Sequence, residues 1–346
     1  MLYDKYIYYL IQLGGPIMLD ERKINEVLKS LCSKGYDCFA SEAQLRDAFA
    51  IELGRKEEDF IVIPEYTQVV PKKWRCSEKD VHFDLFVIDR KANENILLEF
   101  KYKTKNGLFK TRNGMLLDIR DNKDTTNGRY AIWRDIYRIE EFISNSNAIK
   151  IDKGFVIFIT NINAYSNPPK NENKTIAGQF SVKEGYHLAC DKYWNTEDYK
   201  NCTSINDEYR KDKQPLKINN KYYFNYSNYS TLNDEKNNTC SFEKLIVPIF
   251  SKDYENRIQS KLEGIGKNEF INHFDDFKTQ DLKKCKNILI SEGRTENAAL
   301  TRSSKAISLF KEHNEIQAIR NILSSSNRID DELKKRTLEL LKRELK

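Results

Sequence analysis

The stretch from Val81 to Lys103, VHFDLFVIDRKANENILLEFKYK, decides how the rest of the chain is interpreted. Two apolar runs flank a polar segment from Asp89 to Asn95, which predicts two β-strands joined by a turn. Asp84 lies on the first strand, and Glu99 and Lys101 lie two residues apart on the second. These three residue types in this arrangement are the set that a metal-dependent phosphodiesterase needs.

Alternate side chains of a strand share a face, so Glu99, Lys101 and Lys103 point one way and their apolar neighbours point into the core. If the two strands pair, the carboxylates of Asp84 and Glu99 converge. Such oxygens suit Mg²⁺, which keeps several waters and accepts substrate phosphate. The cation would lower the pKa of the attacking water and stabilise charge at phosphorus, while Lys101 contacts that water or the scissile phosphate.

The alternative interpretation of these charges is a strand face exposed to solvent. However, Asp84 and Glu99 interrupt apolar strands at positions that should otherwise be half buried. A carboxylate there costs desolvation free energy unless it has a partner, and a metal ion is a common partner. The context therefore favours the metal-site interpretation.

Helices and an extended segment are predicted ahead of this stretch. Residues 20–35 carry apolar side chains at helical spacing and end at a glycine. A second helix begins at the N-cap candidate Ser41 and has Glu42 in its first turn. Residues 60–69 are predicted to be extended, and Pro64 favours an edge strand or a bend.

The elements after the stretch alternate between connections, a helix and strands. Residues 103–126 form a polar connection, and residues 128–143 form a helix with isoleucines on one face. The apolar run 154–160 predicts a strand buried on both sides. Residues 161–240 are interpreted as loops and edge strands, and 242–250 as the last strand of this domain.

Asp84, fourteen intervening residues and Glu99-Phe100-Lys101, together with this order of elements, resemble the PD-(D/E)xK nuclease superfamily. The resemblance covers roughly residues 20–250. It implies a restriction-endonuclease-like α/β fold, an α+β mixed sheet flanked by helices. The chain departs from the motif at Phe83, where the superfamily name has proline.

The resemblance also implies roles for individual residues. Asp84 and Glu99 would bind the metal ion, with the Phe100 backbone carbonyl as a third ligand, and Lys101 would orient or activate the water. Glu42 matches the acid that many members carry on the first helix, where it binds the metal directly or through water. The implied reaction is Mg²⁺-dependent hydrolysis of DNA, with Mn²⁺ as a substitute, leaving a 5′-phosphate and a 3′-hydroxyl.

Four basic residues are candidates for DNA binding. Arg134 and Arg138 lie one helical turn apart, away from the isoleucines, and could contact phosphates. The alternative for this pair is local ion pairing along the same helix, and the sequence does not decide between the two. Lys103 and Lys105 extend the basic edge beyond Lys101.

The pattern of apolar and polar residues changes after Ser251. Short helical patterns follow one another, so the chain is divided into a nuclease-like domain, 1–250, and an all-helical domain, 251–346. Residues 281–312 resemble a helix-turn-helix. Three basic residues lie near its second helix: Arg294, Arg302 and Lys305. The alternative for this domain is a protein-interaction or dimerisation module.

Composition limits the class of protein. The 346 residues include 58 basic and 52 acidic side chains, and the net charge of +6 is compatible with a polyanionic partner without requiring one. Seven scattered cysteines without a CxxC pair are interpreted as reduced thiols. The apolar run Tyr6–Leu19 is too short to cross a membrane, so it is predicted to pack on the body or on a second subunit of a cytoplasmic protein.

The leading hypothesis is therefore a Mg²⁺-dependent DNA endonuclease in defence or DNA processing, whose helical domain recruits DNA, a homodimer partner or another protein. The alternative is a nuclease-fold DNA-binding or regulatory protein that does not cut. A third possibility is a structural adaptor that acts through its helical domain.

Overall fold

The computed structural model describes residues 18–69, 80–121, 124–145, 149–194, 215–325 and 329–346. Most of the apolar run Tyr6–Leu19 lies outside these residues. Two compact units divide after Ser251, and each is described by itself.

The first unit is built on a six-stranded sheet in the order β1-β2-β3-β6-β12-β11. Its strands are β1 (Phe60–Val69), β2 (Asp80–Asp89), β3 (Glu94–Lys103), β6 (Lys153–Thr160), β11 (Tyr226–Asn233) and β12 (Thr239–Phe250). The β3–β6 pair is parallel and the other pairs are antiparallel, so the sheet is mixed, as predicted.

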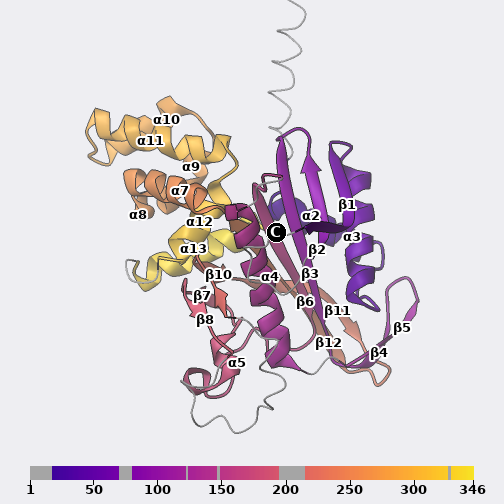
Figure 1. The fold of residues 1–346 in the computed structure, drawn as a ribbon. Helices are drawn as coiled ribbons and strands as arrows, with labels where there is room; N and C mark the ends of the chain where they lie inside the picture. The colour runs from indigo at the N-terminus through magenta and orange to yellow at the C-terminus, as the bar shows by residue number, and fades with distance from the viewer. Residues whose placement is uncertain (1–17, 70–79, 122–123, 146–148, 195–214, 326–328) are drawn as a thin grey trace, which may run out of the picture. The chain divides into compact units, whose positions relative to one another are not determined.

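Helices cover the two faces of this sheet (Figure 1). α2 (Glu21–Ser33) and α3 (Glu42–Lys56) pack on one face, and α4 (Thr125–Asn145) packs on the other. The predicted caps are confirmed, because Asp20 accepts a hydrogen bond from the Lys23 amide and Ser41 accepts one from the Gln44 amide. The unit therefore has one apolar core on each side of a central sheet.

The isoleucine face of α4 and the apolar run of β6 are both buried as predicted. Ile132, Ile136 and Ile139 have no exposed surface, and every residue of β6 is buried. On the opposite face, the Phe49 ring on α3 meets the Phe100 ring of β3 at 5.2 Å between centroids. β3 is thus covered on both faces, and its charged residues Glu99 and Lys101 are buried.

The polar connection predicted for residues 103–126 contains a hairpin instead. β4 (Gly107–Lys110) and β5 (Leu116–Ile119) pair antiparallel, and the buried Phe109 ring packs against Phe242 at 5.6 Å. These strands are short, and Asn and Gly between them resemble a loop in sequence.

Smaller elements fill the region before β11: η1 (Glu172–Lys174), α5 (Ile176–Gln179), β7 (Gly185–His187), β8 (Asp191–Lys192), β9 (Leu216–Lys217) and β10 (Tyr222–Phe224).

β2 and β3 separate partway along their length. Their antiparallel pairing ends at Leu85 and Leu98. Beyond this pair, residues 80–83 of β2 pair with β1, and residues 99–103 of β3 pair with β6. We call the opening between residues 80–84 and 99–103 the fork.

The alternation of side chains in β2 changes at the start of the fork. Leu85 packs in the core beneath α2 and α3, whereas Phe83 packs in the core beneath α4. On the neighbouring strand β1, Glu65 has a left-handed backbone with φ of 51° and directly follows Pro64. The bend expected at Pro64 is therefore confirmed, and it faces the point where Asp84 leaves the regular ladder.

The second unit is helical throughout its described residues. Its helices are α7 (Lys252–Ile265), α8 (Lys267–Asn272), α9 (Phe274–Lys278), α10 (Leu282–Ser291), α11 (Glu296–Lys311), α12 (Glu315–Leu323) and α13 (Asp331–Glu344). Thr295 and Asp330 are N-caps as predicted, whereas Asp281 caps α10 and Thr279 ends α9. Within the described residues, no helix has the length and apolar character needed to cross a membrane.

Candidate functional site

Carboxylates replace the missing strand partners inside the fork. Asp84 Oδ2 accepts a hydrogen bond of 2.7 Å from the Phe100 amide, and Glu42 Oε2 accepts one of 2.9 Å from the Tyr102 amide. A buried amide without a partner would cost free energy, so the backbone of β3 holds both carboxylates in place. Glu42 reaches the fork because Ser41 starts α3 immediately before it.

The Lys101 ammonium lies among three oxygen atoms from three elements. Its Nζ is 2.8 Å from the Phe100 carbonyl oxygen, 2.9 Å from Asp135 Oδ2 and 3.4 Å from Glu42 Oε1. Burial acts to lower the pKa of Lys101, but the surrounding carboxylates, Asp135 foremost, raise it above its ordinary value. The ammonium is therefore charged although only 8% of the residue is exposed.

Glu99 is an almost fully buried acid with incomplete compensation. Its Oε1 has no hydrogen-bond donor among the described residues and lies 3.3 Å from Arg138 Nη2. Burial, and then the nearby Asp135, raise the pKa of Glu99 well above its ordinary value, while Arg138 and Lys101 oppose this. An acid in this state gains from any additional positive charge.

Phe83 and Arg138 pack together beside the fork. The Arg138 guanidinium lies over the Phe83 ring, 5.0 Å from its centroid, and donates to the His82 carbonyl. The Phe83 ring is buried against Phe142 at 4.7 Å. The aromatic side chain thus supports the arginine that faces Glu99.

Asp135 on α4 also belongs to this network. It is fully buried, and besides Lys101 it lies 3.4 Å from Arg138 Nη1. The sequence does carry a signal, because Asp135 lies three residues after Ile132 and four before Ile139, on the apolar face of α4. An acid at such a position requires a buried cation.

The structure thus brings together the five groups predicted for catalysis and metal binding: Glu42, Asp84, Glu99, the Phe100 carbonyl and Lys101. With Asp135 and Arg138, these residues make a cluster of four acids and two bases, a formal excess of two negative charges. Among the described residues, no three His, Cys, Asp or Glu side chains are grouped to hold a metal ion.

The predicted DNA-binding residues divide into two kinds. Arg138 is engaged inside the fork, and its pairing with Asp135 agrees with the local ion-pair alternative. Arg134 is exposed on α4, while Lys103 is half-buried and Lys105 exposed beyond the end of β3. These three have no ion-pair partner in the described part of the chain, so their charges are available to a ligand.

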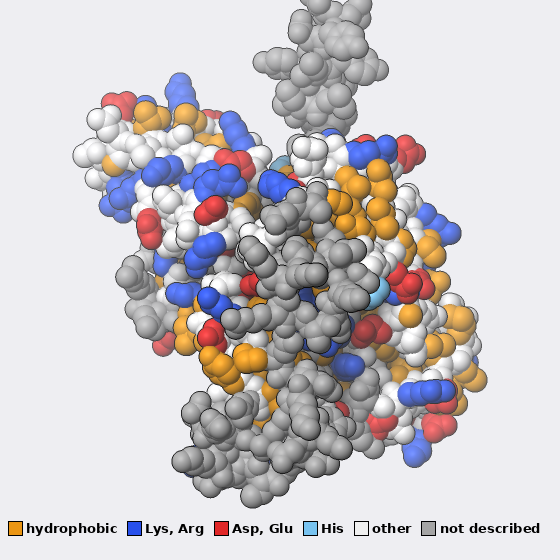
Figure 2. All heavy atoms as spheres, viewed as in Figure 1, with side chains coloured by type: hydrophobic (Ala, Val, Ile, Leu, Met, Phe, Trp, Pro, Cys, Tyr) orange, Lys and Arg blue, Asp and Glu red, His pale blue; other side chains and the backbone are white. Residues whose placement is uncertain are grey.

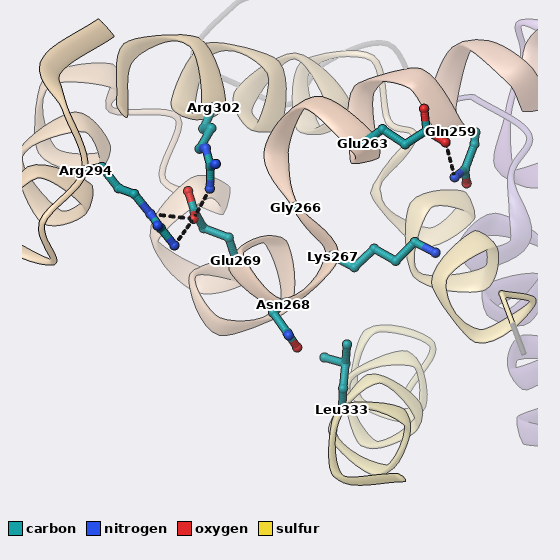
Figure 3. Close-up of a pocket in the computed structure, with 9 residues that line it drawn as sticks. All are labelled: Gln259, Glu263, Gly266, Lys267, Asn268, Glu269, Arg294, Arg302 and Leu333. Carbon is teal, nitrogen blue, oxygen red and sulfur yellow. Dashed lines mark hydrogen bonds and ion pairs between the residues drawn. The ribbon is translucent and has the colours of Figure 1, made fainter. Parts of the chain in front are cut away.

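Two of the three basic residues singled out in the helical unit, Arg294 and Arg302, are engaged in ion pairs. Glu269 on α8 pairs with Arg294 Nη2 at 3.0 Å and with Arg302 (Figure 3). Lys305 packs against Gly264, where a Cβ atom would overlap it. Glu269, Arg294 and Arg302 border a cavity of about 370 Å³. Figure 2 shows Lys and Arg side chains of this unit interspersed with acidic ones.

Replacing Glu269 with alanine is expected to lower the free energy of unfolding of the helical unit by roughly 1 to 2 kcal/mol, because two arginines lose a mostly buried partner. Glu263→Ala is the matched control, since Glu263 accepts a hydrogen bond from Gln259 on its own helix. Chemical denaturation of the full chain measures both. Equal effects of the two variants would contradict the structural role assigned to Glu269.

The fork thus places carboxylate and carbonyl oxygen atoms beside a charged lysine. A scan against protein-family models and a search of curated proteins both found no match to this chain.

Proposed function

We propose that residues 18–251 form a metal-dependent DNA endonuclease of restriction-endonuclease-like fold. The observation that carries this proposal is the convergence of Asp84, Glu99, Lys101 and Glu42 where β2 and β3 separate. The elements α3, β2, β3, α4 and β6 support the fold assignment, because they follow the α-β-β-α-β order of the resemblance, with β1 inserted before β2 and the hairpin β4–β5 before α4.

The residues in the fork fit a divalent cation. Asp84, Glu99 and the Phe100 carbonyl would hold Mg²⁺ or Mn²⁺, and Glu42 would bind it directly or through water. The formal excess of two negative charges, counted with every acid ionised, equals the charge of one such ion. When bound, the cation would supply an activated water and stabilisation of charge on the phosphate.

The remaining residues would orient the reactants. Lys101 would position the attacking water or contact the scissile phosphate, since it is charged and within 3.4 Å of Glu42. Arg134, Lys103 and Lys105 would hold backbone phosphates, which fix the register of DNA without reading its sequence. The helical unit would add a DNA, homodimer or protein contact.

A non-cleaving, nuclease-fold binding protein is the second candidate. One observation favours it: Lys101 and Arg138 already pair with the acids of the fork. A network compensated in this way can be purely structural. Such a protein would use Arg134, Lys103 and Lys105 for binding and would have no need of the cation.

The test is incubation of the protein with plasmid, linear and single-stranded DNA in Mg²⁺, Mn²⁺ or EDTA. Cleavage is expected with either metal and not with EDTA. Asp84→Asn and Lys101→Ala are each expected to lower the rate by about 10²- to 10³-fold, because each removes an interaction with developing charge. Asp191→Asn, an exposed acid on β8, is the control and should cut like wild type.

The outcomes separate the candidates. DNA binding without cleavage under any metal would favour the binding protein. Absence of both binding and cleavage would favour the structural adaptor. Cleavage that persists in Asp84→Asn would place the active site elsewhere in the chain.

A further inference from the structure

We propose that the Lys101 ammonium is a built-in substitute for the divalent cation, and that cation binding displaces it onto Asp135. This inference rests on the proposed function for the identity of the ion. It adds a regulatory property of the same site, namely competition between an internal lysine and the metal.

The contacts of Lys101 define the two positions of its ammonium. The Phe100 carbonyl oxygen, at 2.8 Å, and Glu42 Oε1, at 3.4 Å, both belong to the group that would receive the metal. Asp135 Oδ2, at 2.9 Å, does not belong to this group, since it comes from α4, which covers the face of the sheet opposite α2 and α3. The lysine therefore bridges the metal position and a separate acid.

Asp135 is suited to retain the displaced ammonium. It is fully buried, so without a cation beside it the carboxylate would lack compensation. Arg138 supplies only part of this, because its Nη1 is 3.4 Å away and its Nη2 faces Glu99. Lys101 can thus leave the Phe100 carbonyl and Glu42 while it keeps one buried ion pair.

Electrostatics sets the direction of the expected effect. A divalent cation and an ammonium a few ångströms apart repel each other strongly in a site that excludes most water. Removing the ammonium also raises the formal excess of negative charge in the fork from two to three. Lys101→Met keeps most of the side-chain volume, and it is expected to bind Mn²⁺ roughly 10- to 100-fold more tightly than wild type.

Asp135→Asn is expected to have the opposite effect, because the ammonium loses its second position. Mn²⁺ affinity should fall by about tenfold when Lys101 is present. In the Lys101→Met background, the same change at Asp135 should have little effect. This dependence of one variant on the other distinguishes displacement from a simple loss of charge, which would be additive.

The experiment is calorimetric titration of the full-length protein with Mn²⁺ alone, without DNA, for the four members of this cycle. Lys153→Met is the matched control, because Lys153 is a buried lysine on β6 that pairs with Glu94 at 2.6 Å. Its Mn²⁺ affinity should equal that of wild type. The double variant removes both buried charges together, so it keeps the test informative if Lys101→Met alone unfolds.

Each outcome decides. Tighter binding by Lys101→Met with a non-additive cycle supports the displacement. Unchanged Mn²⁺ affinity of Lys101→Met, together with DNA cleavage by wild type, overturns the displacement and leaves the proposed function standing. Binding by Lys101→Met but not by wild type supports the internal cation and overturns the metal-dependent enzyme. Absence of Mn²⁺ binding in all four proteins of the cycle, wild type included, overturns both the displacement and the proposed function.

Discussion

Replacing Glu99 with glutamine is expected to lower metal-dependent DNA cleavage by about 10³-fold and at the same time to make the protein more stable at about pH 8. Cleavage falls because a neutral amide is a poor ligand for Mg²⁺. Stability rises because burial, and then repulsion from Asp135 and Asp84, disfavour the charged carboxylate, and glutamine removes that cost at nearly constant volume. Opposite effects on activity and stability are typical of residues retained for chemistry.

The gain in stability should depend on pH with a defined sign. The pKa of Glu99 is raised on folding, chiefly by burial. Between its unfolded and folded pKa values the folded protein keeps a proton that the unfolded chain has lost, so wild-type stability falls as pH rises through this window. Glutamine does not titrate. The difference in melting temperature should therefore be small near pH 5 and reach about 2 to 4 °C near pH 8.

Thermal unfolding without metal, measured across this range, checks the stability prediction, and the cleavage assay checks the activity. Glu94→Gln is the matched control on the same strand, because Glu94 pairs with Lys153 outside the fork. It should leave cleavage unchanged and give no gain in stability. A melting temperature of Glu99→Gln below that of wild type at about pH 8 would show that Arg138 depends on the charge of Glu99.

Replacing Trp133 with alanine is expected to lower the free energy of unfolding of the sheet-containing unit by about 3 to 5 kcal/mol. The Trp133 ring is fully buried at the centre of the core beneath α4, and its Nε1 donates to the Ser181 carbonyl at 3.0 Å. The Phe224 ring lies 5.2 Å away, and Lys192 Nζ lies 4.1 Å from the ring centroid. Alanine would leave a cavity and remove the aromatic contact of a buried ammonium, which would keep only its hydrogen bond to the Gln179 carbonyl among the contacts described.

Denaturant unfolding followed by far-ultraviolet circular dichroism measures this loss. Arg134→Ala, at the adjacent exposed position of α4, should change the stability by less than about 0.5 kcal/mol. A loss of under about 1 kcal/mol for Trp133→Ala would show that the core beneath α4 can collapse around the missing ring.

Local patterns predicted the elements that depend on local physics. The capped starts of α2 and α3, the apolar face of α4 and the buried run of β6 follow from neighbours within a few residues. The hairpin β4–β5 was missed because its strands are held by contacts made far along the chain, such as Phe109 with Phe242. The position of β12 between β6 and β11 is likewise a matter of tertiary pairing.

The same division applies to the fork. Asp84, Glu99 and Lys101 stand out in sequence because charges interrupt apolar strands. The end of strand pairing at Leu85 and Leu98 has no such signature, because both residues are ordinary strand formers. Because the sequence does not reveal this opening, it could not predict that carboxylates cap the amides of β3 or that Asp135 holds the lysine.

The kink in β1 also bears on how the protein avoids unwanted association. In the described sheet β1 is an outer strand, which is where a second chain could add by backbone pairing. Pro64 lacks an amide hydrogen, Glu65 turns the backbone out of the extended conformation, and its carboxylate is held 2.8 Å from Arg46. A proline, a twist and a charge are the features that keep free sheet edges from joining. The bend opposite Asp84 therefore also protects the sheet against edge-to-edge aggregation.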